Sequence, residues 1–154
     1  ADKHKKGILI LVNKWDLIEK DTKTALEYQK RIEERLGEFN YIPIIFTSML
    51  TKQRVFQAIE KASDIYEHRQ QRISTSKLND LLGKDIEHYP PPSVKGKHIK
   101  IKYITQLPTK TPSFAFFCNH PKYVKMDYRR YLENKIRSHF NFEGVPISIF
   151  FRQK

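Results

Sequence analysis

The sequence has little cysteine and little glycine, and each shortage excludes a class of protein. A single cysteine, Cys118, leaves no internal disulfide framework and no multi-cysteine zinc site. The six histidines show no i, i+4 pair and no cysteine partner, so we expect no metal site. Five glycines in 154 residues exclude collagen-like and glycine-rich disordered chains.

Long apolar runs are missing as well. The longest, Ile8–Val12 and Phe114–Cys118, fall far below the roughly 20 residues of a membrane-spanning helix. The basic N-terminal residues lead into an apolar stretch too short for a signal peptide, and no small-residue cleavage site follows it. Because hydrophobic residues still make up 39% of the chain, we expect a globular, cytoplasmic protein with no membrane partner.

The charge is strongly positive and unevenly distributed. The formal net charge is +12. Residues 1–72 hold 14 basic and 11 acidic side chains, a net +3, whereas residues 73–154 hold 15 and 6, a net +9. A basic surface attracts phosphate backbones, which favours a nucleic-acid partner, although it also suits acidic proteins.

Strand and helix patterns alternate in residues 1–72. Continuous apolar runs at Gly7–Val12 and Ile42–Phe46 predict strands buried on both faces. A helix is predicted over Thr24–Leu36, with Leu26, Ile32 and Leu36 on one side and Gly37 as its C-cap. A second helical stripe is formed by Val55, Ile59, Ala62, Ile65 and Tyr66. This order predicts a parallel crossover unit, and since two strands are too few to stand alone, we expect the back half of a larger α/β domain.

Residues 73–154 predict a different order, helix–strand–strand–helix–strand. A Ser/Thr cluster at Ile73–Ser76 offers an N-cap for a short helix that Pro90 to Pro92 ends. Ile99, Ile101 and Tyr103 alternate with Lys100 and Lys102, which is typical of a half-buried strand with a basic outer face. The remaining predicted elements are an antiparallel neighbour strand at Ser113–Cys118, an amphipathic helix at Lys125–Phe140 and a third strand at Val145–Phe151. We therefore expect a small α+β domain with its helices on one sheet face.

The aromatic side chains of this half follow strand and helix periodicity. Periodicity favours a place in the core over a role as base-stacking platforms. The aromatics interpreted in this way are Phe114, Phe116, Tyr128, Tyr131, Phe140 and Phe150.

The motif that carries chemistry is Asn13-Lys14-Trp15-Asp16, directly after the first buried strand. Open α/β sheets bind ligands in loops at this end of a strand. The Asn-Lys-x-Asp pattern resembles the guanine-recognition loop of Ras-like GTPases. The carboxylate of Asp16 can accept both N1–H and the exocyclic amine of guanine, a donor pair that adenine lacks. The resemblance implies that the stem of Lys14 lies along the base and that Asn13 ties neighbouring loops together. An ordinary helix-capping turn is the alternative.

A second motif, Thr47-Ser48-Met49-Leu50, follows the second predicted strand. Ras-like proteins carry a Ser-Ala-x loop there, whose backbone N–H binds the guanine O6. Ser48 matches that pattern and Met49 replaces the alanine, which keeps the donor but narrows the pocket. An ordinary strand-to-helix turn is equally compatible with these four residues.

The catalytic end of a GTP site is missing from the sequence. No two glycines stand five residues apart, so there is no G-x-x-x-x-G-K-[ST] phosphate loop. Phosphoryl transfer needs that loop, its lysine and a held Mg²⁺. We therefore expect no catalytic residue here and no GTP hydrolysis by these 154 residues alone.

Four stretches of the second half resemble the C-terminal KH-like domain of the EngA/Der family. They are Lys102–Gln106, Pro112–Asn119, Tyr128–Arg137 and Gly144–Ile147. Those bacterial proteins carry two tandem GTPase domains before this domain, hydrolyse GTP and act in large ribosomal subunit assembly. The resemblance implies a division into the back half of the second Ras-like GTPase domain, residues 1–72, and the KH-like domain, residues 73–154.

The same resemblance implies cofactors and partners. The cofactor would be GTP or GDP, and the whole protein would hold Mg²⁺ through residues absent here. The partners would be the large ribosomal subunit with its RNA and the first GTPase domain. An Era-type GTPase also joins a GTPase domain to a KH domain. It would carry a Gly-x-x-Gly loop, and no two glycines of this sequence have that spacing.

We expect the whole protein to be a monomer and the fragment, with unpaired strand edges, to self-associate.

Five basic residues could contact an RNA backbone even without a Gly-x-x-Gly loop. The candidates are Lys97, Lys100, Lys102, Arg129 and Arg130. A solvated face is the alternative for each of them, and an interaction module docking on the first GTPase domain is the alternative for the whole KH-like part.

Overall fold

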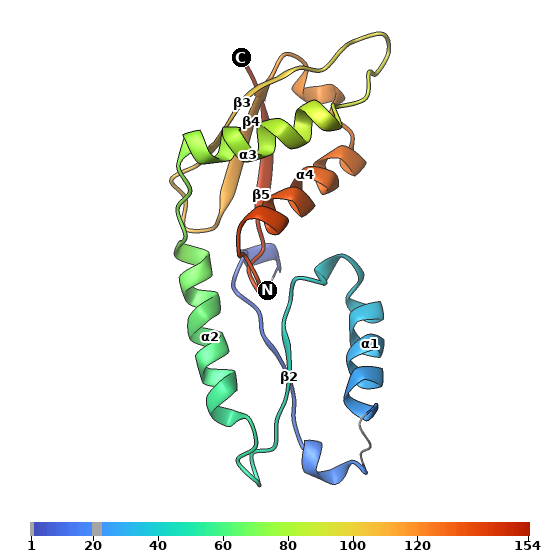
Figure 1. Ribbon diagram of the computed structural model, residues 1–154, viewed down its shortest axis with the longest axis vertical. Coiled ribbons are helices and arrows are strands. Elements are labelled where there is room, and N and C mark those ends of the chain that lie inside the picture. The colour runs from blue at the N-terminus through green and yellow to red at the C-terminus, as the bar shows by residue number, and fades with distance from the viewer. Residues whose placement is uncertain (1, 20–22) are drawn as a thin grey trace. The chain divides into compact units, whose positions relative to one another are not determined.

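The computed structural model describes residues 2–19 and 23–154 (Figure 1). By its contacts the chain divides into two compact units. The N-terminal unit comprises Ala1–His68 and Phe142–Val145, and the C-terminal unit comprises Arg69–Asn141 and Pro146–Lys154. The division falls between His68 and Arg69, in the last turn of the helix Val55–Gln70. The short segment Phe142–Val145 comes late in the sequence but belongs to the N-terminal unit.

The N-terminal unit is built on two parallel strands, β1 (Ile10–Val12) and β2 (Ile44–Phe46). Between them lie α1 (Thr24–Leu36) and two short 3-10 helices, Trp15–Leu17 and Gly37–Phe39. The long helix α2 (Val55–Gln70) follows β2. The strand–helix–strand–helix order is confirmed, and Gly37 caps α1 at a φ of 55° as expected.

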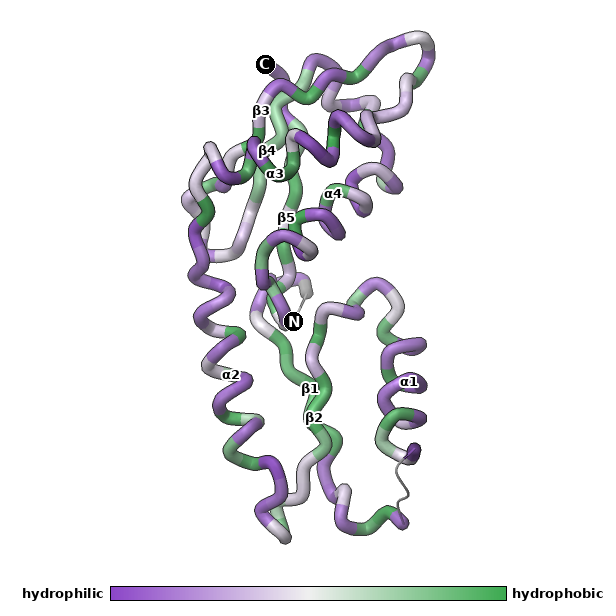
Figure 2. The backbone as a smooth tube through the Cα atoms, viewed as in Figure 1, coloured by the Kyte–Doolittle hydropathy of each residue, from purple (hydrophilic) through white to green (hydrophobic). Residues whose placement is uncertain are grey.

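Burial in this unit differs from the prediction in two places. Leu11 is 42% exposed, so β1 is not buried on both faces, because its two-stranded sheet provides too little cover. In α2 the buried residues are Ala58 and Ile65, whereas Ile59 and Tyr66 are more than half exposed. Figure 2 shows hydrophobic colouring along β1 and β2, with hydrophilic residues spread over α1 and α2.

The segment Phe142–Val145 is held in the N-terminal unit by its backbone. Gly144 donates to the carbonyl of Tyr41 and accepts from the N–H of Ile8, both at 2.7 Å. Gly144 has a φ of 74°, and a Cβ built on it would lie 2.7 Å from Ile65. Only glycine fits this crossing of backbones without displacing its neighbours.

The C-terminal unit has the predicted helix–strand–strand–helix–strand order. Its elements are α3 (Thr75–His88), β3 (Ile101–Gln106), β4 (Ser113–Cys118), the 3-10 helix Pro121–Tyr123, α4 (Met126–His139) and β5 (Ser148–Gln153). The sheet has the order β3-β4-β5, antiparallel between β3 and β4 and parallel between β4 and β5. Ser74 caps α3 by accepting from the N–H of Lys77 at 3.3 Å. Figure 1 shows α3 and α4 over the same face of this sheet.

The core of this unit is largely as predicted, except for one aromatic residue of β5. Leu78, Leu82, Phe114, Phe116 and Leu132 are fully buried. Phe150, expected in the core, is 46% exposed, because it alternates with the buried Ile149 along β5.

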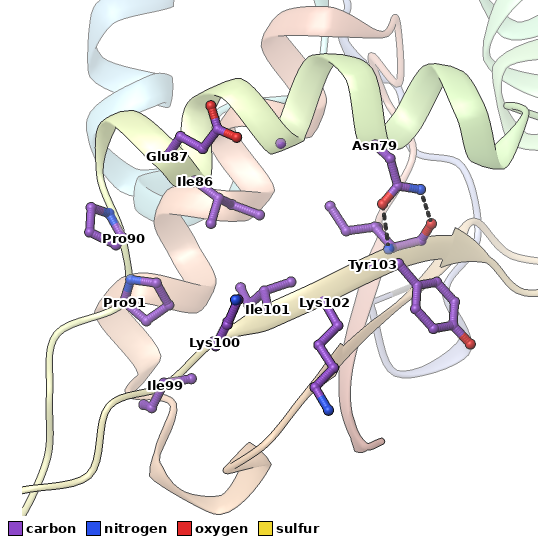
Figure 3. A pocket seen from close by; sticks show the side chains of 12 residues that line it. Asn79, Ile86, Glu87, Pro90, Pro91, Ile99, Lys100, Ile101, Lys102 and Tyr103 are labelled. Carbon is purple, nitrogen blue, oxygen red and sulfur yellow. Dashed lines mark hydrogen bonds between the residues drawn. The ribbon is translucent and has the colours of Figure 1, made fainter.

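A β-bulge changes the register of β3 between Ile101 and Tyr103. Since one extra residue moves later side chains to the opposite face, Ile104 enters the core at 1% exposure in place of Tyr103. Downstream of the bulge, the amide side chain of Asn79 donates to the carbonyl of Ile104 and accepts from its N–H, at 2.8 and 2.9 Å (Figure 3).

Candidate functional site

The two loops predicted to bind a base lie beside each other in the N-terminal unit. Because β1 and β2 run parallel, their carboxyl ends at Val12 and Phe46 meet at one edge of the sheet. The backbone continues the pairing past the strands. Thr47 donates to the carbonyl of Val12 at 2.8 Å, and Trp15 donates to the carbonyl of Thr47 at 3.1 Å.

Side chains from the two loops bind one another. The hydroxyl of Ser48 donates to Oδ1 of Asp16, and the same Oγ accepts from the N–H of Thr51 at 3.2 Å. The side-chain oxygen of Asn13 accepts from the N–H of Met49 at 3.3 Å. Two residues of the first motif are thus bound to two residues of the second.

Trp15, the third residue of the first motif, anchors its loop. Its indole is 3% exposed and packs on Phe46 at 4.4 Å and on Tyr28 at 5.5 Å between ring centroids. Lys14, directly before it, has a left-handed backbone with φ 58° and ψ 32°. Burial of the indole offsets the cost of this conformation, and it leaves Lys14 and Asp16 beside each other on the outer side of the loop.

A cavity of about 230 Å³ opens between these loops. Its lining consists of Asn13, Lys14, Asp16, Leu17, Met49 and Leu50. Leu17 is 72% and Leu50 84% exposed, so two large apolar side chains border the cavity and face solvent. A cavity with one carboxylate, apolar walls and a lysine stem suits a flat heterocycle whose edge carries hydrogen-bond donors.

Sequence reasoning missed three of the residues that build this site. Trp15 occupied the unspecified position of its motif, although a lone tryptophan after a strand is itself a sign of a buried anchor. Leu50 stood in the second motif without a role of its own, and Leu17 carried no signal, because nothing in the sequence distinguishes an exposed leucine at a cavity from a buried one.

The five candidate nucleic-acid residues occupy two different environments in the C-terminal unit. Lys97, Lys100 and Lys102 are exposed on β3 and the segment before it. Lys100 and Lys102 line a groove of about 410 Å³ between α3 and β3 (Figure 3). The ammonium of Lys97 lies 5.2 Å from the ring centroid of Tyr123.

The two arginines of α4 differ from each other. Arg129 is half-buried, donates to the carbonyl of Ile149 at 3.2 Å and lies over the ring of Phe151 at 5.3 Å. Its guanidinium is therefore engaged inside the domain. Arg130, one residue along the helix, is exposed.

A polar cluster that the motifs did not indicate joins α3 to α4. The carboxylate of Asp85 contacts His139 at 2.6 Å and Lys135 at 3.3 Å. Burial pushes the pKa of Asp85 upward, but the hydrogen bonds from His139 and Lys135 outweigh it and hold the pKa below its ordinary value. In β4, burial raises the pKa of the Cys118 thiol, which is fully buried.

Comparison with protein families identifies the second half of the chain. The model of the KH-domain-like, C-terminal domain of EngA bacterial GTPase enzymes matches residues 72–152. The chain belongs to this family. The EngA match covers α3, β3, β4 and α4 in full and β5 up to Arg152.

Curated relatives match over the whole chain. Proteins named GTPase Der are 58% identical in Amoebophilus asiaticus, 56% in Flavobacterium johnsoniae and 58% in Cytophaga hutchinsonii, each over 154 residues and 100% of this chain. The chain spans only 35–36% of the length of these relatives. It therefore corresponds to a C-terminal part of proteins that are GTPases by name.

Among residues 2–19 and 23–154, no group of three or more His, Cys, Asp or Glu side chains is arranged to hold a metal ion. Over the same residues, no helix combines the length and the apolar character needed to cross a bilayer.

Proposed function

We propose that this chain reads the guanine base in a GTP-binding, GTP-hydrolysing protein of the Der type. The observation that supports the proposal best is the pairing of the two loops, with Ser48 bonded to Asp16 and Asn13 to Met49 around one cavity. Names of relatives support the nucleotide class, since the matching proteins are called GTPases.

The geometry suggests how each residue acts on the base. Ser48 fixes the carboxylate of Asp16 through Oδ1, so that the rigid carboxylate can accept from the two adjacent donors of guanine. The stem of Lys14 covers one face of the ring, and the Asn13 bond keeps the Met49 loop close to the O6 edge. Adenine would leave the lone pairs that Asp16 turns toward the base desolvated and without a donor, which disfavours adenine by about 10⁴-fold.

The chemistry of hydrolysis is proposed to lie with other residues of the longer protein. Without a phosphate loop these 154 residues supply no cradle for the phosphates and no ligands for Mg²⁺. Purified alone, the chain should show no GTP turnover once contaminating GTPases have been removed.

The base-reading role is tested by Asp16→Asn in the full-length protein. The amide keeps an oxygen toward Ser48 and turns its NH₂ toward the base, where it matches the carbonyl of xanthine. We expect weaker GTP binding and a preference for xanthosine triphosphate, measured by competition calorimetry. Glu19→Gln, the same change at an exposed position of that loop, is the control. Unchanged preference in the Asp16 variant would show that this carboxylate does not read the base.

We further propose that the KH-like part binds RNA of the large ribosomal subunit during its assembly in the cytoplasm. Residues 73–154 carry the net charge of +9, and Lys97, Lys100 and Lys102 lie exposed on one strand and its approach. Phosphate contacts of this kind position a protein without reading sequence. Arg130 is exposed beside this unit's other basic residues, whereas Arg129 is half-buried and bonded to the carbonyl of Ile149.

Replacement of Lys100, just before β3, and Lys102, within it, tests the RNA surface. Lys100→Ala with Lys102→Ala should weaken subunit binding and flatten the slope of log K against log salt by about 1.5, since each phosphate contact contributes 0.7–0.9. Lys84→Ala with Lys110→Ala removes the same charge elsewhere in the unit. Binding that is insensitive to salt would instead favour docking of this part on the first GTPase domain.

A last proposal concerns assembly. Leu11 of β1 is 42% exposed, and Phe56 and Ile59 of α2 are 77% and 62% exposed, in a unit whose sheet has two strands. Such a surface promotes pairing with another copy, so the isolated chain should self-associate and the full-length protein should be a monomer. Analytical ultracentrifugation of both proteins tests this directly.

A further inference from the structure

A cavity rich in tyrosine lies where α3 ends and α4 begins, apart from the lysines of β3. Its volume is about 540 Å³. The lining residues are Tyr89, Pro92, Lys125, Asp127, Tyr128 and Tyr131. Figure 1 shows the C-terminal end of α3 and the start of α4 on the same side of the C-terminal unit.

The three tyrosines hold one another in a fixed arrangement. Tyr89 is stacked on Tyr128 at 6.1 Å and meets Tyr131 edge-on at 5.0 Å between centroids. The hydroxyl of Tyr128 donates to the main-chain carbonyl of Tyr89, and that of Tyr131 donates to the carbonyl of Asp85. With both hydroxyls turned toward α3, the cavity presents ring surface, and Tyr89 is 54% exposed.

Two charged groups of opposite sign flank these rings. Lys125 is the N-cap residue of α4, and Asp127 lies in the first turn of that helix. Both side chains are exposed. A cation, a carboxylate and an aromatic surface within one cavity match the three parts of a nucleotide: its phosphate, the amino group of its base and the flat ring.

We propose that this cavity takes up one unpaired nucleotide of RNA, with the base on Tyr89, its exocyclic amine toward Asp127 and a phosphate toward Lys125. The proposal rests on the RNA binding put forward above and names a subsite for it. Charge complementarity favours RNA over a protein segment, since residues 73–154 carry 15 basic and only 6 acidic side chains. Unpaired bases recognised by proteins stack on aromatic side chains in this way.

The carboxylate makes the proposal specific. Cytosine presents an amino donor where uracil presents a carbonyl acceptor, and an Asp side chain accepts from the former and repels the latter. The cavity should therefore prefer cytidine to uridine, two bases of equal size. Asp127→Asn should abolish that preference, because an amide can serve either base.

The experiment uses the full-length protein and fluorescein-labelled octamers of cytidylate and uridylate, with affinity measured by anisotropy at fixed salt. Tyr89→Ala should weaken binding of the cytidylate octamer about tenfold, whereas Tyr89→Phe should leave it unchanged. Since Tyr128 bonds the main chain of Tyr89, that hydrogen bond survives the substitution. Ultraviolet crosslinking of 5-iodocytidine octamers to the unaltered protein should mark the peptide that contains Tyr89.

Phe150→Ala is the matched control, because Phe150 is an aromatic of similar exposure on β5. It should leave the affinity for both octamers unchanged. Wild-type affinity in Tyr89→Ala, while the Lys100 and Lys102 double variant loses subunit binding, would overturn this proposal and leave the RNA function standing. Crosslinking to a ribosomal protein at Tyr89 would overturn it in favour of a protein partner. Absence of any salt-sensitive RNA binding would overturn both.

Discussion

The hydroxyl of Ser48 donates to the carboxylate of Asp16 across 32 residues of sequence. The bond exists because two parallel strands end at the same edge of their sheet and each is followed by a tight turn. It places an otherwise mobile carboxylate in one orientation before any ligand arrives.

Ser48→Ala should weaken binding of GDP by the full-length protein about 10- to 150-fold, because a hydrogen bond to a charged group contributes about 1.5–3 kcal/mol. Isothermal titration calorimetry measures the effect. Ser63→Ala, at an exposed position of α2, is the control. If Ser48→Ala lowered the free energy of unfolding by as much as it lowered the free energy of GDP binding, the hydroxyl would support the fold and would not act by orienting the Asp16 carboxylate.

Trp15→Ala should lower the free energy of unfolding of the N-terminal unit by about 3–5 kcal/mol, since it empties the space beside Phe46 and Tyr28. Trp15→Phe fills most of that space and should cost less. Urea denaturation followed by far-ultraviolet circular dichroism measures both. If the alanine variant unfolded at the wild-type urea concentration, the indole would not be the anchor of its loop.

Gly144→Ala should destabilise the chain by about 2–4 kcal/mol, from the left-handed backbone together with overpacking against Ile65. Gly96→Ala is the matched control, because Gly96 has a φ of 72° but nothing within 4 Å of the added methyl group. It should cost only the backbone part, about 1 kcal/mol. If the two variants had equal urea midpoints, the contact of the added methyl group with Ile65 would contribute nothing to the loss of stability.

Asp85→Asn should destabilise the C-terminal unit at neutral pH and have little effect in acid. The pKa of Asp85 is lower in the folded chain than its ordinary 3.8, so the stabilisation is present above that pH and is lost as pH falls through the folded value. We expect a difference of about 0.5–1 kcal/mol at pH 6–7 that shrinks below pH 4. Urea titrations of both proteins over this range would measure it, and a constant difference would contradict the linkage.

The order of elements could be predicted from the sequence because each carried its own local signal. Gly37 and Ser74 ended and began their helices as capping chemistry requires, and apolar runs located the strands. Burial was harder to predict, since it depends on neighbours far along the chain. Ile59 matched a helical stripe and yet is 62% exposed, and the bulge before Tyr103 reversed the faces of β3 without any glycine or proline to announce it.

The polar residues of the candidate site could be predicted from the sequence, whereas the apolar residues that line its cavity could not. Asn13, Asp16 and Ser48 stood out as a spacing of functional groups, and the structure brings them together. Tyr89 and Asp127 lie 38 positions apart with no motif between them. Only the packing of α3 on α4 places their side chains around one cavity.

The double hydrogen bond between Asn79 and Ile104 has a consequence for the outer border of the C-terminal sheet. An edge strand has unpaired N–H and C=O groups, and an extended segment of another chain can pair with them and start aggregation. Here one amide side chain imitates the peptide of a missing neighbour and occupies both groups of Ile104. Asn79 thus takes the place of a neighbouring strand at one residue of β3, and another chain cannot pair with β3 at Ile104 while these two bonds are formed.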